Sequence, residues 1–249
     1  MDNVRLETDD AKATVTIDRP AVMNAFDSKT RSELTSTLAG LKDDEGIRVV
    51  VITGAGDSAF SAGQDVSESR EFGAEDATEW VAEWDALYAE LLGFEVPVIA
   101  KLNGVAVGAA FQVALLCDLR IAAPHAKVGM PEIDIGIPCV LGSWMIERIA
   151  GYAPAAELSL TGEPIDPERA ATLGLVTRVV PEEELDAAVD ELAGELAAKS
   201  PVAMTWQKRW LRGLLFEEDV SEIMERGQEI HAEVYESGDP ERYMSEFLE

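Results

Sequence analysis

The feature that most constrains the fold is the alternation of short apolar runs with segments that have the helical period. Residues 49–52 (VVVI) form a continuous β-branched run, which is typical of a strand buried on both faces. Residues 96–100 have the same character, and residues 77–92 between them are amphipathic at the period of a helix. Strands that alternate with helices predict an α/β fold.

Similar patterns place the remaining elements. The 249 residues suit one large domain, or one domain with an appendage. Ser28 is the expected N-cap of a helix over residues 28–42, and Pro201 should begin a last set of helices. A loop punctuated by prolines is expected over residues 130–138. Further strands are expected at residues 4–6, 13–17, 119–122 and 126–128, and further helices at residues 108–117 and 182–199.

The charge of the chain restricts its partners. Its 48 Asp and Glu against 20 Lys and Arg give a net charge of −28 and a pI near 4.3. Such a field repels the phosphates of nucleic acids and the anionic face of a membrane, so we expect neither as a partner. The acids are spread along the chain, and only 7 of the bases are Lys. This favours a solvated surface adapted to a high-salt cytoplasm over a merely acidic mesophilic protein.

The residues available disfavour metal and membrane sites. The two cysteines, Cys117 and Cys139, and the two histidines, His125 and His231, lack the spacing of a zinc site. We therefore expect no metal, and free thiols. The first residues lack the basic and apolar regions of a signal peptide, and the longest apolar stretch, residues 104–117, is too short to span a bilayer. A cytoplasmic location is expected.

One glycine-rich motif invites a nucleotide-binding interpretation. Residues 54–59 (GAGDSA) follow an expected strand and fit the dinucleotide fingerprint G-x-G-x-x-G/A, with Glu75 about 20 residues further on. The fingerprint requires its third position to open a helix that packs on the sheet. Because residues 60–65 have no helical period, we interpret the motif as a glycine-rich connection.

Two segments of small residues could present bare backbone N–H groups to a ligand. Small side chains at residues 61–64 allow close approach to the main chain. Residues 103–110 form a small-residue loop that opens a helix, where unpaired N–H groups and the helix dipole favour developing negative charge. Together the two segments could form an oxyanion hole. Each alone is also compatible with simple close packing.

Polar side chains in apolar surroundings are the candidates for chemistry. Gln112 stands within an apolar run, on the helix face of Ala109 three residues earlier; the alternative is a buried amide bonded to backbone. Glu132 also has apolar neighbours, and desolvation favours its protonated form and suits general acid–base work. Asp134, two residues on, is a further candidate. In a chain so rich in acids, the alternative for both carboxylates is surface decoration.

A series of short motifs gives these candidates a context. The motifs are Arg19-Pro20…Asn24-Ala25-Phe26, followed by residues 60–65 (FSAGQD), 97–100 (PVIA), 103–108 (NGVAVG), 116–122 (LCDLRIA), 130–138 (MPEIDIGIP) and 170–176 (AATLGLV). In content and order they resemble the crotonase, or enoyl-CoA hydratase/isomerase, superfamily. The resemblance covers nearly the whole chain and is far more specific for the superfamily than for the reaction.

The resemblance implies a fold and an assembly. The family fold is a spiral of ββα units, which we expect over residues 1–200 together with the acyl-CoA site. A helical C-terminal region, residues 201–249, would build homotrimers, which are often paired as hexamers.

The resemblance also implies a ligand and its contacts. The ligand would be an acyl-CoA thioester, and no cofactor is needed beyond the coenzyme A of the substrate. The N–H groups of Gln64 and Ala109 would form the oxyanion hole that binds the thioester oxygen. Arg19 and Lys208 are the bases that we would assign to the CoA phosphates. The remaining CoA contacts would come from the same stretches, and the full expected set is Ala21, Ala62, Gln64, Asp65 and Ala109.

Departures from the family pattern bear on the reaction. Hydratases of the family use two glutamates, at the positions of Gln112 and Glu132; glutamine can orient a water but cannot accept its proton. The resemblance therefore favours an isomerase, in which Glu132 alone moves a proton between C2 and C4. Ala109 stands where the family usually has glycine, and its methyl group could narrow the pocket. The alternatives are an acyl-CoA lyase or decarboxylase, and a non-catalytic RNA-binding member, against which the net charge argues.

Overall fold

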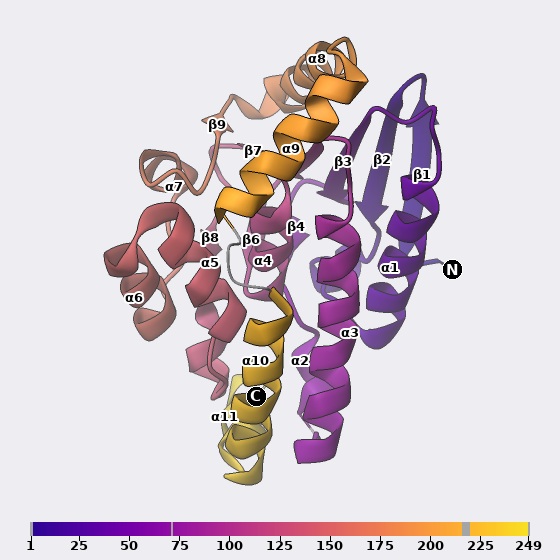
Figure 1. The fold of residues 1–249 in the computed structure, drawn as a ribbon. Helices are drawn as coiled ribbons and strands as arrows, with labels where there is room; N and C mark the ends of the chain where they lie inside the picture. The colour runs from indigo at the N-terminus through magenta and orange to yellow at the C-terminus, as the bar shows by residue number, and fades with distance from the viewer. Residues whose placement is uncertain (1, 71, 216–219, 249) are drawn as a thin grey trace.

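The strands form two sheets in the computed structural model, which describes residues 2–70, 72–215 and 220–248 (Figure 1). In the larger sheet β1 is antiparallel to β2, and all other neighbouring strands are parallel. The strand order is β1-β2-β3-β5-β7-β9. The bounds are β1 Val4–Asp9, β2 Lys12–Ile17, β3 Val49–Gly54, β5 Val98–Leu102, β7 Leu119–Ala122 and β9 Arg178–Val179.

The chain passes alternately through the two sheets. The smaller sheet is parallel and consists of β4 (Ala59–Ser61), β6 (Val105–Val107) and β8 (Val128–Gly129). Each of β3, β5 and β7 is followed by a strand of the smaller sheet and then by helix, so the ββα spiral expected from the resemblance is confirmed. The helices up to the last sheet strand are η1 Pro20–Val22, α1 Ser28–Lys42, α2 Val66–Ser69, α3 Ala74–Leu92, α4 Ala109–Leu116, η2 Pro131–Ile135, α5 Val140–Ala150, α6 Tyr152–Thr161 and α7 Pro167–Thr172.

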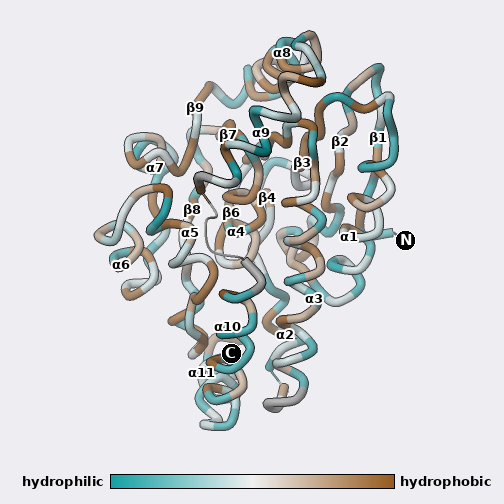
Figure 2. The backbone as a smooth tube through the Cα atoms, viewed as in Figure 1, coloured by the Kyte–Doolittle hydropathy of each residue, from teal (hydrophilic) through white to brown (hydrophobic). Residues whose placement is uncertain are grey.

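The continuous apolar run at β3 is explained by burial on both faces. Side chains alternate across a strand, and here Val50 and Ile52 join the main core. Val49 and Val51 face the other way and form a second apolar cluster with α8 (Leu185–Ala197). Figure 2 shows the resulting brown colour of β3 at the centre of the molecule.

The last three helices return to the body of the same chain. They are α9 (Pro201–Leu215), α10 (Val220–Glu236) and α11 (Asp239–Leu248). α10 packs against α3 and α5, and α11 packs against α2 and η2 (Figure 1). Assembly through residues 201–249 stays a prediction. None of the described helices combines the length and the apolar character that crossing a membrane requires.

Several expected boundaries were wrong, each for a local reason. The N-cap of α1 is Asp27 and not Ser28, because the Asp27 carboxylate accepts from the Thr30 N–H at 2.7 Å. α3 begins one turn earlier than expected, where Asp76 accepts from the Gly73 N–H. The expected loop at 103–110 contains β6, and the loop at 130–138 contains a 3₁₀ turn, η2. The expected helix over 182–199 is η3 (Glu182–Glu184) followed by α8, and the strand expected at 126–128 is β8.

Candidate active site

A glycine with positive φ brings the two small-residue segments together. β4 pairs with β6, so the segments that follow them lie side by side. Gly63 has a φ of +86°, and a Cβ on it would lie 2.6 Å from the Val107 carbonyl oxygen and 3.4 Å from the Ala109 nitrogen. Only glycine tolerates both this conformation and this approach.

The backbone directions aim two N–H groups at one cavity. Phe26 donates its N–H to the Gly63 oxygen at 2.8 Å and accepts from the Asp65 N–H at 2.9 Å. The peptide N–H of Gln64, between these two bonds, therefore points away from Phe26. Ala109 is the first residue of α4, so its N–H has no acceptor within the helix. Neither N–H has an acceptor among the described residues, and both residues line the cavity.

The Glu132 carboxylate lies close to the N-terminus of α4 and lines the same cavity. Its carboxylate comes from η2, which follows β8. Gly108 has a φ of +57°, and a Cβ there would lie 3.6 Å from Glu132 Oε1. The Gly108 N–H donates to the Gly129 oxygen at 2.9 Å, which ties β6 to the strand that precedes η2. The pairing of β6 with β8 therefore positions the carboxylate beside the Ala109 N–H.

Burial changes the acidity of Glu132. The residue is 8% exposed, and burial raises its pKa to about 7, against the opposing effect of donors such as the Gln112 amide. Gln112 donates its Nε2–H to Glu132 Oε1 at 3.0 Å. The other oxygen, Oε2, is buried and has no hydrogen-bond partner in the described structure. A carboxyl group near half ionisation at neutral pH, with one unoccupied oxygen in the cavity wall, can both take and return a proton.

Tyr88 fixes which end of the Gln112 amide faces the carboxylate. The Tyr88 hydroxyl donates to Gln112 Oε1 at 2.8 Å. Since Oε1 is occupied by a donor, the amide N–H groups are the ones that point at Glu132. Tyr88 is itself held by stacking on Trp84, with ring centroids 5.5 Å apart.

The cavity that these groups share has a volume of about 330 Å³ and an apolar lining. No Lys or Arg is among the described residues that line it. Helix α3 contributes an aromatic side, Trp80, Trp84 and Tyr88, spaced by one helical turn each. The C-terminal helices α10 and α11 close another side, with Ile223, Met224, Gly227, His231 and Phe247.

Of the other residues expected at the site, some line the cavity and others do not. Ala62 lines the cavity, and its N–H donates to the Met23 oxygen. Ala21 is exposed in η1 and does not line the cavity. Asp65 does not line it either, because its carboxylate caps α2 at Ser67. Asp134 lines the cavity but is exposed.

Neither base assigned to the CoA phosphates is free. The Arg19 guanidinium is paired with Asp27 and Asp65, at 3.0 and 3.1 Å. The assignment of Lys208 was wrong. Its ammonium is buried against the Asp118 carboxylate at 2.7 Å, away from the cavity, and burial lowers its pKa to about 8.

The aromatic side of the cavity and one buried cation were not predicted from the sequence. Trp80, Trp84 and Tyr88 repeat every fourth residue, a pattern that is usually explained by core packing. Arg31 occupies a core-facing position of α1, three residues before Leu34, and is 2% exposed. A charged residue in phase with an apolar stripe was the available signal. The cavity-lining role of His231 had no signal, since it depends on the packing of α10.

Comparison with known proteins identifies the family. The family model described as enoyl-CoA hydratase/isomerase matches residues 7–249. The chain belongs to this family. This match confirms the resemblance that the motifs indicated. The protein is an enzyme of the enoyl-CoA hydratase/isomerase family, whose substrates are acyl-CoA thioesters.

Individual relatives from the same family agree. The short-chain-enoyl-CoA hydratase of Clostridium acetobutylicum is 33% identical over all of this chain and 95% of its own length. The crotonyl-CoA hydratase of Syntrophomonas wolfei is 35% identical over 83% of this chain and 80% of its own. A solved enoyl-CoA hydratase/carnithine racemase from Magnetospirillum magneticum superposes with a TM-score of 0.83 at 34% identity, covering 86% of this chain and 81% of the other.

Proposed function

We propose that the protein moves the double bond of 3-enoyl-CoA thioesters to C2, and does so faster than it hydrates 2-enoyl-CoA. The observation that carries the proposal is the pairing of Glu132 with an amide. Glu132 is the one buried carboxylate among the described residues that line the cavity, and the group facing it is Gln112. An amide has no basic site that could take a proton from water.

The proton moves in two steps through Glu132. The Oε2 of the Glu132 carboxylate takes a proton from C2, and the electron pair of the broken C–H bond passes into the thioester to form a dienolate. The dienolate oxygen accepts hydrogen bonds from the N–H groups of Gln64 and Ala109, which hold the developing negative charge. Glu132 then returns the proton at C4, and the double bond comes to lie between C2 and C3. No water and no further cofactor enter this sequence.

Gln112 stabilises the Glu132 carboxylate but does not itself transfer a proton. Its N–H donates to Glu132 Oε1, which stabilises the ionised form and leaves Oε2 for the substrate. Hydration would need a water that is held and deprotonated while C2 is protonated. With an amide at 112, Glu132 alone would have to serve both steps.

The lining of the cavity supports a hydrocarbon acyl group. A free carboxylate on the acyl chain would be buried without a cation, because the described lining residues include no Lys or Arg. This disfavours substrates that lose carbon dioxide, and with them the decarboxylase alternative.

Hydration is the second candidate, and the relatives favour it. They include a short-chain-enoyl-CoA hydratase, a crotonyl-CoA hydratase and, at 36% identity, a carnitinyl-CoA dehydratase from Escherichia coli. One N–H of the Gln112 amide is not used by Glu132 and could hold a water.

The two candidates are separated by product analysis. The enzyme is incubated with 3-enoyl-CoA and with 2-enoyl-CoA in parallel, at equal concentration, and the products are resolved by chromatography. We expect the first substrate to be converted faster than the second is hydrated. Hydration that equals or exceeds isomerisation would overturn the proposal and assign water positioning to Gln112.

We further propose that α9 mediates a homotrimer or hexamer. One side of α9 is fixed to the body of the chain through Lys208. The opposite side exposes Val202, Trp206 and Trp210, one turn apart, and Trp206 is 64% exposed. An apolar stripe of this kind on a highly charged surface is typical of an interface. Sedimentation of Trp206→Glu/Trp210→Glu should show a smaller particle than wild type; an unchanged particle would place the interface elsewhere.

A further inference from the structure

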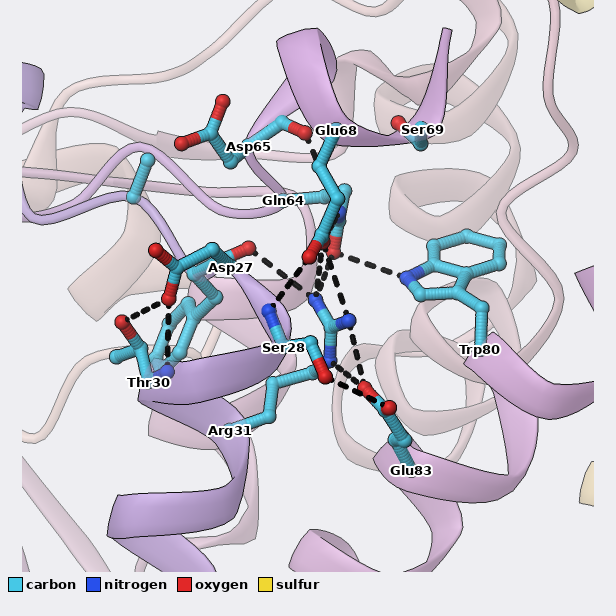
Figure 3. A network of polar contacts seen from close by, with 12 residues as sticks. Asp27, Ser28, Thr30, Arg31, Gln64, Asp65, Glu68, Ser69, Trp80 and Glu83 are labelled. Carbon is cyan, nitrogen blue, oxygen red and sulfur yellow. Dashed lines mark hydrogen bonds and ion pairs between the residues drawn. The ribbon is translucent and has the colours of Figure 1, made fainter. Parts of the chain in front are cut away.

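Arg31 is a buried cation at the centre of an ionic network with the partly exposed Glu68 and Glu83 (Figure 3). Its Nε donates to Glu83 Oε2 at 2.7 Å, and its two terminal nitrogens both reach Glu68 Oε2 at 3.1 Å. Nη1 also donates to the Phe26 oxygen at 3.2 Å, the same oxygen that accepts from the Asp65 N–H. The guanidinium lies over the ring of Trp84, 5.5 Å from its centroid.

The network occupies every hydrogen-bonding position of the Gln64 side chain. Gln64 Oε1 accepts from Arg31 Nη1 at 2.7 Å and from Trp80 Nε1 at 2.9 Å. Gln64 Nε2 donates to Glu68 Oε2 at 2.9 Å and to the Asp65 oxygen at 3.3 Å. An amide has two acceptor and two donor positions, so this one is saturated and has a single orientation. Figure 3 shows Gln64 held between Arg31, Glu68 and Trp80.

Stability alone does not account for a cation at this position. Burying an ion pair costs desolvation that a packed apolar side chain of similar volume would avoid. Arg31 occupies a core-facing position of α1 that is otherwise apolar, with Leu34 and Leu38 completely buried on the same face. What the guanidinium adds is direction, because its planar fork fixes several acceptors at once.

We infer that Arg31 is a positioning residue for the reaction. By holding the Gln64 side chain and the Phe26 carbonyl, it fixes the plane of the Gln64 peptide, and with it the direction of the N–H aimed at the thioester oxygen. The inference rests on the proposed oxyanion role of Gln64. Trp80 and Trp84 both touch the network and line the cavity, so the network is in contact with the space that the acyl group would fill.

The test uses a signal that reports on the hydrogen bond itself. Butanoyl-CoA labelled with ¹³C at C1 is bound to the enzyme, and the infrared stretch of its thioester carbonyl is measured. Donors at the oxygen lower this frequency relative to free butanoyl-CoA. Arg31→Met should lose at least half of the lowering and reduce kcat by about tenfold to a hundredfold, somewhat less than removal of a whole oxyanion donor. KM should change by less than about threefold, because the lost interaction belongs to the transition state.

A matched control separates positioning from stability. Lys208→Met also removes a buried cation from a carboxylate, Asp118, but neither residue lines the cavity. It should lower the melting temperature while the carbonyl frequency and kcat stay near wild type. Arg31→Lys should recover melting temperature better than kcat, since an ammonium neutralises the carboxylates but lacks the fork. If Arg31→Met fails to fold, Glu83→Gln removes one arm of the network at a partly exposed site and should give a smaller change in the same direction.

A double-mutant cycle tests the route of the effect. Gln64→Met keeps the peptide N–H and removes the side-chain amide. If Arg31 acts through this amide, the losses in kcat from Arg31→Met and Gln64→Met should not add. Additive losses, or an unchanged carbonyl frequency in Arg31→Met, would overturn the inference. A wild-type enzyme that does not lower the frequency would instead overturn the oxyanion role, so the two failures are distinguishable.

Discussion

The two sides of the cavity treat their polar groups in opposite ways. On the Gln64 side, a guanidinium, two carboxylates and an amide are mutually satisfied, and no donor or acceptor of the amide is left over. On the Glu132 side, one carboxylate faces apolar walls, with one oxygen bonded to Gln112 and the other unpartnered among the described residues. Saturated groups hold geometry, whereas a group left incomplete is free to react.

The same comparison bears on our proposal that acid–base chemistry falls to Glu132 alone in a chain with 48 acids. Glu68 and Glu83 do not line the cavity, and both are paired with Arg31, which contacts the lining residues Gln64 and Trp84. Among the carboxyl groups of the described residues, Glu132 is the one whose pKa burial raises to about 7, and no cation offsets that burial.

The largest expected effect comes from removing the Glu132 carboxylate, which has one unpartnered oxygen. Glu132→Gln should lower turnover of 3-enoyl-CoA by about a hundredfold or more, the usual scale for loss of general acid–base help. Binding of acyl-CoA, measured by calorimetry with butanoyl-CoA, should stay near wild type. Near-normal turnover would transfer the role to Asp134, the other carboxylate that lines the cavity.

The second effect is on the pH profile. Glu132 must be ionised to take the C2 proton, so kcat/KM should fall below pH 7 by about tenfold per pH unit. The native pKa is raised above its usual 4.5, so the native state binds more protons than the unfolded chain between these values, and stability is lost as pH rises through 7. Glu132→Gln should therefore be more stable than wild type at pH 8, by up to about 3 kcal/mol in the free energy of unfolding. A flat profile between pH 5 and 8 would contradict this assignment.

The third prediction concerns replacement of the Gln112 amide by a second carboxylate. Gln112→Glu is nearly isosteric and should raise the ratio of hydration to isomerisation by about tenfold, because a second carboxylate can take a proton from water. Two buried carboxylates 3 Å apart share a proton, so some stability should be lost. Gln112→Leu is the control and should not raise the ratio. The ratio is read from the two product assays run in parallel.

A smaller effect is expected from removing the hydrogen bond that orients the Gln112 amide. Tyr88→Phe removes the donor that orients Gln112, so the amide oxygen can turn toward Glu132 and favour its protonated form. The acid limb of the pH profile should move upward by about half a unit, equivalent to about 0.7 kcal/mol and typical of one hydrogen bond. Tyr235→Phe, at a buried tyrosine that does not line the cavity, should leave the limb in place. An unmoved limb in Tyr88→Phe would show that Tyr88 serves packing alone.

The smallest effect concerns neither side of the cavity but the surface around both. With a net charge of −28, the fold should gain several degrees in melting temperature between dilute buffer and molar KCl, as screening weakens self-repulsion. Screening should affect the buried Arg31 guanidinium little. Turnover measured well below the melting temperature should therefore vary little with the KCl concentration. A melting temperature that does not respond to KCl would reject salt adaptation.

The sequence predicted the parts of the fold and the site that depend on local pattern. The apolar runs located β3 and β5, and the motifs around Gly63 and Glu132 indicated the family. In the small sheet β8 was expected, but β4 and β6 were missed, because they are three residues long and are defined only by pairing with neighbouring strands. The N-cap of α1 was misplaced by one residue for a similar reason, since Asp27 and Ser28 are both good caps.

Contacts between distant segments could not be predicted from pattern. The bond from Tyr88 to Gln112 joins α3 to α4, and the Arg31 network joins α1, α2 and α3. Lys208 looked like a free base in the sequence, and only the packing of α9 on Asp118 shows its partner. Each of these depends on which helix faces lie against each other after folding.

The participation of α10 and α11 in the cavity wall has a consequence for how the enzyme can diversify. The proposed reacting groups lie within residues 62–132, whereas part of the cavity lining comes from residues 223–247. These two stretches of coding sequence are separated by about 90 codons and can vary independently. Exchange of the final helices between relatives would be a direct route to new acyl preferences, with the proton-transfer apparatus carried over intact.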